Sequence, residues 1–270
     1  DVIDALVAGT AIATWCLGEH TPNDHLGSIA CDVRVDGDDL VVSGVKRPVE
    51  SGGDADHLLV VGRTGAGLSQ VLVPRHASGV TVEPLQTVDL TRRFSAVAFD
   101  DVRVPVDAAV GVVGEAGEHV ERQLQLALVM LNAESVGAMQ RAFDMTVEWA
   151  FDRYSFGRPL ASYQELKHRF ADMASWLQTA HALSDAAADA VQDRSRDAAE
   201  LVSVAKAFIG QYGLELLQDC VQIHGGIGVT YEHDLHLFLR RVTLDSALYG
   251  TAADHRKRIG TMACEREVVG

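Results

Sequence analysis

The sequence predicts an α+β protein, in which an antiparallel β-sandwich or barrel is followed by an up-down four-helix bundle. Short β-rich runs separated by turn residues fill residues 28–107, a spacing typical of a sandwich or barrel. From about Glu118 almost to the end, apolar residues instead recur every three or four positions. Because the two patterns are segregated along the chain, we expect a β-domain at 1–110 and a helical bundle at 111–270.

The β-rich half contains two hairpin signals. The runs 28–35 and 40–44 flank Asp36-Gly37-Asp38-Asp39, and a short Asp-Gly turn between β-rich runs is typical of a hairpin. The runs 57–62 and 70–74 flank Gly65-Ala66-Gly67 in the same way. Further strands are expected at 10–17, 80–85 and 95–104, and the end of a helix at 1–9.

The second half contains apolar stripes with helical spacing. The stripes are Val120, Leu124, Leu128 and Leu131, then Leu166, Phe170, Met173 and Leu177, then Leu201, Ala205, Phe208, Tyr212, Leu216 and Cys220. Breaks fall at 157–159, 193–196 and 225–228, and near Gly250. Four or five helices with short connections predict an antiparallel bundle.

Composition excludes several classes of function. The 270 residues carry a formal charge of −15, which argues against nucleic acid and against a generic anionic membrane surface as partners. No apolar run reaches the roughly 18 residues of a membrane span. Cys16, Cys31, Cys220 and Cys264 lack metal-like spacing, so we expect buried thiols in a reducing, cytoplasmic setting. The chain starts at Asp1 rather than methionine, as a fragment of a longer protein does.

Two segments of the helical half stand out. The segment from Gln222 to Glu232 places a glycine cluster between two helical patterns. Alone, that cluster is typical of a helix stop, and it also lets a ligand approach the main chain closely. Upstream lies Arg153-Tyr154-Ser155-Phe156-Gly157-Arg158-Pro159-Leu160, followed by Gln164 and the run 166–173.

This pair of segments, in this order, resembles the C-terminal half of the acyl-CoA dehydrogenases. Residues 99–105 are similar to the last strand of that family's β-domain, and residues 11–19 to its entry. The resemblance implies the central β-domain and the C-terminal four-helix bundle of a three-part architecture. The family's N-terminal helical domain, which normally covers one side of the acyl pocket, is absent from the sequence.

The resemblance also implies that the cofactor is FAD, held across a subunit interface. Arg153 matches the arginine that pairs with the FAD pyrophosphate, a role that suits a bidentate guanidinium. The segment at Gln222 matches one that meets the adenosine end from a second subunit, on the side opposite Arg153. Taken singly, Arg153 also fits a surface cation and Phe156 a core residue. The matching positions are Arg153, Ser155, Phe156, Gln164, Gln222, Gly225 and Gly226.

The segments that match the flavin-facing part of the family's β-domain depart from its pattern. Gly18 stands at the threonine position of the first segment, and Asp24 replaces a small hydroxyl. In the second segment Pro48 replaces an aromatic residue and Glu50 a threonine. A carboxylate against a flavin would oppose the reduced, anionic form of the ring.

The base that removes the substrate α-proton is also missing from its expected places. In many members it is a glutamate before Gly-Thr, where this chain has Tyr249, and tyrosine is a poor base near neutral pH. The family's second location offers Ala127 and Leu128. The nearest carboxylate is Glu134, for which a hydrogen-bonded structural role inside the bundle is favoured over catalysis. We therefore assign no catalytic residue.

No metal site is expected from the histidines of the last third of the chain. His233 and His236 lie three positions apart on an expected helix, without a cysteine or carboxylate motif to complete a ligand set. Arg240-Arg241 and Asp234 are interpreted as an ion-paired helix surface.

The sequence thus indicates an FAD-dependent acyl-CoA dehydrogenase family oxidoreductase that acts on acyl-CoA thioesters. The missing base favours a degenerate subunit that completes a partner's FAD site. Two alternatives remain open: a competent dehydrogenase with an unconventional base, or a flavin monooxygenase relative. The expected assembly is a homo- or hetero-oligomer through the bundle, of which the α2β2 assemblies of actinobacteria are one form. An active chain would also need an electron-transfer partner.

Overall fold

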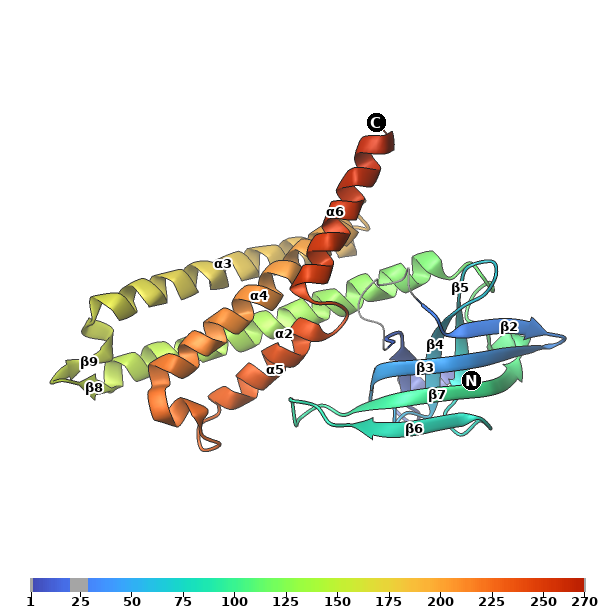
Figure 1. Cartoon of the computed structure of the whole chain (residues 1–270), viewed down its shortest axis with the longest axis horizontal. Helices are drawn as coiled ribbons and strands as arrows, with labels where there is room; N and C mark the ends of the chain where they lie inside the picture. Colours follow the sequence, from blue (N-terminus) through green and yellow to red (C-terminus); the bar gives the residue numbers. More distant parts are fainter. Residues whose placement is uncertain (1, 20–28, 270) are drawn as a thin grey trace. The chain divides into compact units, whose positions relative to one another are not determined.

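The structure is a computed structural model that describes residues 2–19 and 29–269, with side-chain exposure given as far as residue 266. It contains two compact units, residues 1–123 and 124–270, and each is described by itself. The first holds the sheet and the second holds most of the helices, so the expected α+β class is confirmed (Figure 1).

The first unit is built on one curled sheet. Its seven strands lie in the order β1-β4-β2-β3-β7-β6, with β5 paired to β4. The elements of this unit are α1 (Val2–Val7), β1 (Ala13–Cys16), β2 (Asp32–Asp36), β3 (Asp39–Glu50), β4 (His57–Arg63), β5 (Leu68–Pro74), β6 (Val80–Leu85), β7 (Phe94–Pro105) and the 3-10 turn η2 (Val106–Ala108).

Both predicted hairpins form. In β2–β3, Asp36 pairs with Asp39, and in β4–β5, Arg63 pairs with Leu68, both antiparallel. The strand directions differ from the expected all-antiparallel sheet at two places, because β4 lies parallel to β1 and to β2. Alternation of apolar residues reports which side chains are buried, but it does not report the direction of the neighbouring strand.

The core of this unit lies on the inner faces of β2–β5 and β7. Strands β4 and β5 are buried on both faces along most of their length, which explains their almost continuous apolar sequence. At Gly62 a Cβ atom would come within 2.4 Å of the Val33 side chain, so only glycine fits there. Fully buried members of the core include Leu40, Val42, Leu58, Val60, Val71, Val73, Val97 and Val102.

The helices follow in order along the chain. They are α2 (Gly117–Asp152), α3 (Gln164–Gln192), α4 (Ala198–His224), α5 (Leu235–Ala247) and α6 (Ala252–Val269). A two-residue hairpin, β8 (Tyr154–Ser155) with β9 (Arg158–Pro159), and the turn η3 (Leu160–Ser162) connect α2 to α3. The turn η4 (Gly225–Val229) follows α4. None of the helices in the described part of the chain has an apolar stretch long enough to cross a membrane.

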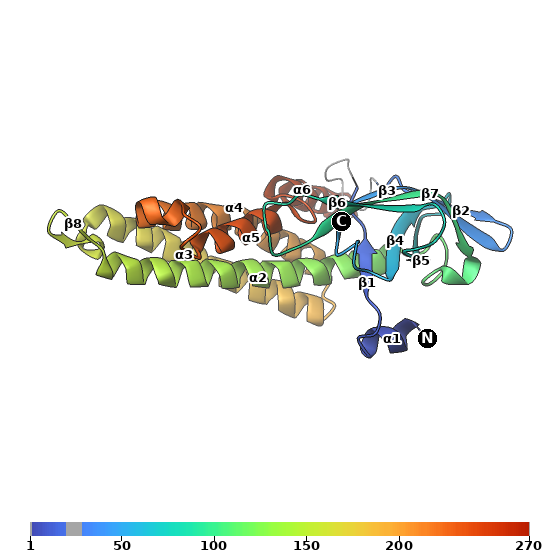
Figure 2. The same ribbon diagram turned by 90° about the horizontal axis from the view of Figure 1, so that it is seen from below.

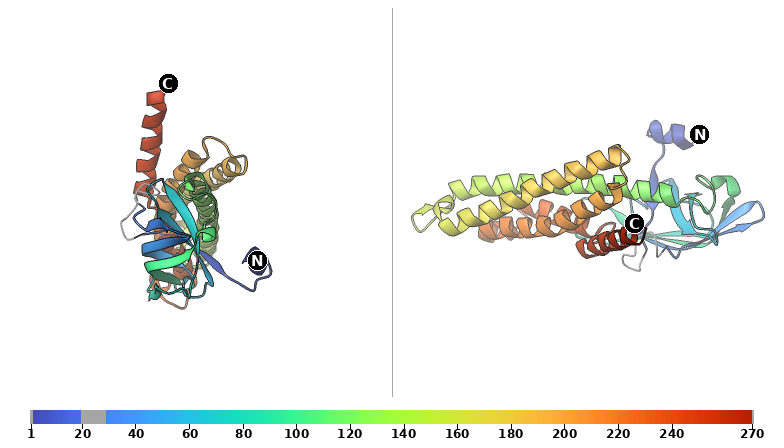
Figure 3. Two further views of the ribbon diagram at one scale, coloured as in Figure 1. Left: turned by 90° about the vertical axis from the view of Figure 1, so that its right-hand side faces the viewer. Right: turned by 90° about the horizontal axis from the view of Figure 1, so that it is seen from above.

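Helix α4 is the central helix of the second unit. It packs against α3, α5 and α6, and fourteen of its residues are buried. At Gly213 a Cβ would come within 3.1 Å of Val242 on α5 and 3.2 Å of Met139 on α2, so this glycine allows close helix packing. Helices α2 and α3 run beside each other, joined by Phe143 and Phe170 at 6.0 Å between ring centroids (Figures 2 and 3).

A polar cluster lies buried inside this apolar bundle. The ammonium group of Lys206 on α4 donates to the main-chain carbonyl of Asp245 on α5. The Asp245 carboxylate accepts a hydrogen bond of 3.1 Å from the Ser135 hydroxyl on α2. Burial lowers the pKa of Lys206 to about 8, although the Asp245 charge opposes that shift. Three helices are therefore joined by one buried polar contact set.

The cysteines divide into two groups. Cys16, Cys31 and Cys220 are buried free thiols, as expected, whereas Cys264 on α6 is exposed. Burial raises the pKa of Cys16 and of Cys220 to about 12 and that of Cys31 to about 11. The three buried thiols are therefore protonated and unreactive at neutral pH.

Candidate functional site

An exposed aromatic residue marks the turn between α2 and α3. Phe156 and Gly157 join β8 to β9 with φ angles of +50° and +80°, the left-handed backbone of a two-residue type I′ hairpin turn. Glycine adopts that conformation freely, whereas a phenylalanine there is strained. The Phe156 side chain is nevertheless 97% exposed. The alternative interpretation of Phe156 as a core residue is therefore wrong.

The hairpin is held rigidly by Tyr163, which lies just before α3. The Tyr163 hydroxyl donates a hydrogen bond to the Ser155 carbonyl at 2.7 Å. The Arg158 guanidinium lies over the Tyr163 ring, 3.8 Å from the ring centroid. The Leu160 N–H donates to the Arg153 carbonyl at 2.8 Å, which continues the strand register. These contacts fix where the tip of the hairpin lies.

Arg153 connects the hairpin to a stack of rings. Its guanidinium lies 5.9 Å from the centroid of the Trp149 ring. On α4 the His224 ring stacks on Trp149, with centroids 5.3 Å apart and an interplanar angle of 16°. The His233 ring follows at 4.6 Å from His224. This stack, Arg153–Trp149–His224–His233, links residues that are far apart in the sequence.

His224 ends α4 and is only 4% exposed. Its Nδ1 lies 2.8 Å from the Cys220 carbonyl, so this nitrogen carries the proton and Nε2 is an acceptor. Burial lowers the pKa of His224, and His233 lowers it further, so the ring is neutral at pH 7. Within the described residues, His224 Nε2 and Trp149 Nε1 are buried without a hydrogen-bond partner.

The glycine segment that follows His224 is open. Gly225 takes a φ of +66° and its N–H caps α4 on the carbonyls of Val221 and Gln222. A Cβ atom at Gly225 or Gly226 would meet nothing within 4 Å, and the Gln222 side chain is exposed. At Gly228, by contrast, a Cβ would come within 2.7 Å of the Val221 carbonyl. The segment therefore turns tightly and leaves its first two glycines accessible.

The structure thus brings Arg153 and the segment Gln222–Gly226 to one end of the same bundle (Figure 1). In an up-down bundle α2 and α4 run in the same direction, so their C-terminal ends meet. One protomer therefore presents both segments at the same end of its bundle, and the expected division of the cofactor site between two subunits stays a prediction. Gln164, the first residue of α3, is exposed, with its Nε2 2.9 Å from Nε2 of His168.

In the first unit, the segment around Gly18 is anchored by an ion pair. The Glu19 carboxylate accepts from Lys46 at 2.6 Å and from the N–H groups of Ala30 and Cys31 at 2.7 and 3.0 Å. Burial favours the neutral acid, but the Lys46 ammonium and these N–H groups together hold the pKa of Glu19 below its ordinary value. The departure noted at Asp24 lies outside the described residues.

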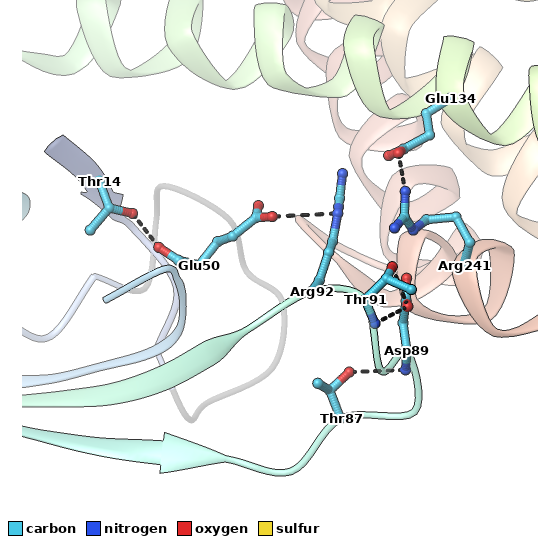
Figure 4. Close-up of polar contacts among 8 residues, drawn as sticks. All are labelled: Thr14, Glu50, Thr87, Asp89, Thr91, Arg92, Glu134 and Arg241. Atoms are coloured by element: carbon cyan, nitrogen blue, oxygen red, sulfur yellow. Dashed lines mark hydrogen bonds and ion pairs between the residues drawn. The ribbon is translucent and has the colours of Figure 1, made fainter. Parts of the chain in front are cut away.

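Glu50 is not a bare carboxylate. The Arg92 Nε lies 3.4 Å from its Oε1, so the charge has a partner that the sequence did not reveal (Figure 4). The loop that carries Arg92 is shaped by Asp89, which accepts from the N–H and the hydroxyl of Thr91, both at 2.8 Å. Pro48 is exposed on the same strand as Glu50. The expected electrostatic conflict at Glu50 is therefore reduced by Arg92.

In the second unit, the positions expected to carry a base hold none. Leu128 is fully buried, and the Glu134 carboxylate accepts from Arg241 in an ion pair between α2 and α5 (Figure 4). This pairing supports a structural role for Glu134. Tyr249 has a φ of +55°, and its carbonyl lies 3.0 Å from Nε2 of the buried His255.

Comparisons with known proteins address the family. The family model "Acyl-CoA dehydrogenase, C-terminal domain" matches residues 117–263. The chain is 27% identical over 258 residues to "Probable acyl-CoA dehydrogenase fadE25" of Mycobacterium leprae, covering 93% of this chain and 66% of that protein. It is 32% identical over 179 residues to acyl-CoA dehydrogenase IpdE2 of Mycolicibacterium smegmatis, covering 66% of this chain and 52% of that one.

A solved structure supports the fold over both units. A glutaryl-CoA dehydrogenase from Mycobacterium smegmatis, in complex with FADH2, matches with a TM-score of 0.86 and 23% identity, covering 96% of this chain and 67% of that one. The chain spans about two thirds of the first relative and about half of the second. Because the family model covers more than half of the chain, this protein belongs to the acyl-CoA dehydrogenase family.

Proposed function

We propose that this chain is an FAD-binding acyl-CoA dehydrogenase subunit that supplies the bundle end of a cofactor site to a catalytic partner. The observation that carries the proposal is the meeting of Arg153 with the open glycine turn Gly225–Gly226 through the rings of Trp149 and His224. A guanidinium that has no ion pair among the described residues and lies near accessible main chain suits a phosphate-bearing nucleotide.

The residues at the bundle end fit the ADP half of FAD. The Arg153 guanidinium forms no ion pair with any described residue, so its N–H groups are available to phosphate oxygens. The open glycines allow a ribose or a base to approach the backbone, and Gln222 offers an amide beside them. Phe156, Ser155 and Gln164 extend this surface along the hairpin and the start of α3.

The roles of this chain and of its partner subunit follow from which residues could accept a proton from the substrate. When bound, FAD accepts the hydride that leaves the β-carbon of an acyl-CoA thioester. The reaction also needs a base at the α-carbon, and the Tyr249 side chain is a phenol, which is a poor base near neutral pH. Glu134 is engaged by Arg241, and Leu128 has no ionisable group. This chain therefore binds and positions the cofactor, while a partner subunit supplies the base.

The proposal includes the assembly. A homo- or hetero-oligomer formed through the bundle, such as α2β2, would place this protomer's hairpin and glycine turn against a cofactor held by another subunit. The substrate would be an acyl-CoA thioester, and an electron-transfer partner would reoxidise the flavin. The buried free thiols fit a reducing cytoplasm.

The experiment is to purify the chain alone and together with a co-expressed partner, then to count FAD per subunit. Dehydrogenation of acyl-CoA is measured with an artificial electron acceptor. We expect no measurable turnover by the chain alone, because loss of a positioned base costs about 10²–10⁴ in rate. Ordinary turnover by the isolated chain, abolished by Glu134→Gln, would instead identify Glu134 as an unconventional base and refute the degenerate-subunit proposal.

A further inference from the structure

Two arginines of the hairpin region rest on aromatic rings. Arg153, before the hairpin, lies over Trp149 at 5.9 Å, and Arg158, after its tip, lies over Tyr163 at 3.8 Å. A ring contact uses the flat face of a guanidinium and leaves the N–H groups at its edge pointing outward. Both groups are thus held in place without using their hydrogen-bond donors.

Neither guanidinium has an acidic partner among the described residues, and neither forms a side-chain hydrogen bond there. Arg34, Arg103 and Arg266, by contrast, lie in ion pairs with carboxylates. Within the segment 153–160 the charged side chains are Arg153 and Arg158, and Asp152 immediately precedes the segment. The hairpin is therefore a local positive region that lacks a counter-charge of its own.

The strand register places both arginines on the same face of the hairpin. Ser155 pairs with Arg158, and Arg153 lies opposite Leu160, whose N–H donates to its carbonyl. Side chains alternate along a strand, so positions 153, 155 and 158 share one face. Positions 153 and 158 are then diagonal neighbours, about 7–8 Å apart. Two long side chains at that separation can reach two adjacent phosphates.

We propose that Arg158 is a second anion-binding residue, which acts with Arg153 to hold both phosphates of a dinucleotide diphosphate. Tyr163 positions Arg158. The guanidinium lies over the Tyr163 ring, and the Tyr163 hydroxyl donates a hydrogen bond to the Ser155 carbonyl of the hairpin. The inference rests on the proposed FAD site, and it adds the residue that binds the second phosphate. The ligand chemistry is a nucleoside diphosphate moiety, with bidentate guanidinium–phosphate contacts.

The test compares the binding of ADP, AMP and FAD by calorimetry, using the chain in its native assembly. Arg158→Gln removes the charge, Arg158→Lys keeps the charge but loses the planar fork, and Tyr163→Leu removes the ring seat. The matched control is Arg141→Gln, which removes an exposed arginine from the α2 surface. We expect Arg158→Gln to weaken ADP and FAD binding about tenfold or more and AMP binding less, with Arg158→Lys and Tyr163→Leu intermediate.

The outcomes separate this inference from the proposed function. Equal ADP and FAD affinities in Arg158→Gln and Arg141→Gln would overturn the role of Arg158, while FAD binding itself would leave the proposed function standing. A selective loss of ADP affinity in a chain that does not bind FAD would support the arginine pair and refute the cofactor proposal. Unchanged circular dichroism and melting temperature of Arg158→Gln establish that any loss reflects binding.

Discussion

The buried Lys206 predicts a specific pH dependence of stability. Burial lowers its pKa to about 8, whereas the unfolded chain restores a value of about 10.5. Between these values the unfolded state binds more protons than the folded state, so this group makes the free energy of unfolding rise with pH. From pH 8 to pH 10 the two pKa values give a rise of about 2 kcal/mol.

The buried thiols act in the opposite direction over the same range. Burial raises the pKa of Cys16 and Cys220 to about 12 and that of Cys31 to about 11, so these thiols keep their protons when folded and release them when unfolded. Their contribution is fully present below an unfolded pKa of about 8.5 and is lost as pH rises. The total stability curve of the protein therefore does not isolate Lys206.

A comparison with Lys206→Met isolates the lysine, because the thiols are common to both proteins. Urea unfolding followed by far-ultraviolet circular dichroism at pH 7, 8, 9 and 10 gives the free energy of unfolding of each. Between pH 8 and pH 10 we expect the free energy of unfolding of the wild type to rise by about 2 kcal/mol more than that of the variant. The exposed Lys167→Met serves as control and should show no such gain. Parallel curves for wild type and Lys206→Met would refute the argument that burial depresses this pKa.

Three further predictions concern the site and the assembly. Arg153→Ala should weaken FAD binding by about 2–3 kcal/mol through loss of a charge-assisted phosphate contact, and unchanged flavin retention on gel filtration would contradict this. Tyr249→Glu should introduce acyl-CoA dehydrogenation into the chain purified alone, because it puts a carboxylate at the position that matches the family's base; a flavin-loaded but inactive variant would count against the missing-base explanation. The protein should be a multimer built through the bundle, and a monomer at micromolar concentration in light scattering would exclude this.

The features that could be predicted from the sequence are those with local signals. The β2–β3 and β4–β5 hairpins are set by short glycine-containing turns, and the helices by apolar spacing and glycine breaks. The motifs also predict Arg153 and the glycine turn Gly225–Gly226 as site residues, and their role in cofactor binding stays a prediction.

Contacts between distant residues carry no comparable signal. The stacking of Trp149 on His224 and the pairing of Glu50 with Arg92 join residues from separate elements, and no spacing rule connects them. The parallel pairing of β4 with β1 could not be predicted for the same reason. The exposure of Phe156 could not be inferred from composition, because aromatic residues are more often buried.

The position of α4 has a consequence for how damage to this protein would be observed. Helix α4 lies at the centre of the bundle, where its residues Gly213 and Lys206 are buried. The same helix ends at His224, directly before the glycine turn of the proposed site. A ligand that binds only the folded state at that end would stabilise the bundle by RT ln(1 + [L]/Kd). Conversely, a substitution in the middle of α4 that shifts the helix axis would release the nucleotide at temperatures where the bundle is still folded. Loss of cofactor would then be the earliest sign of a weakened core.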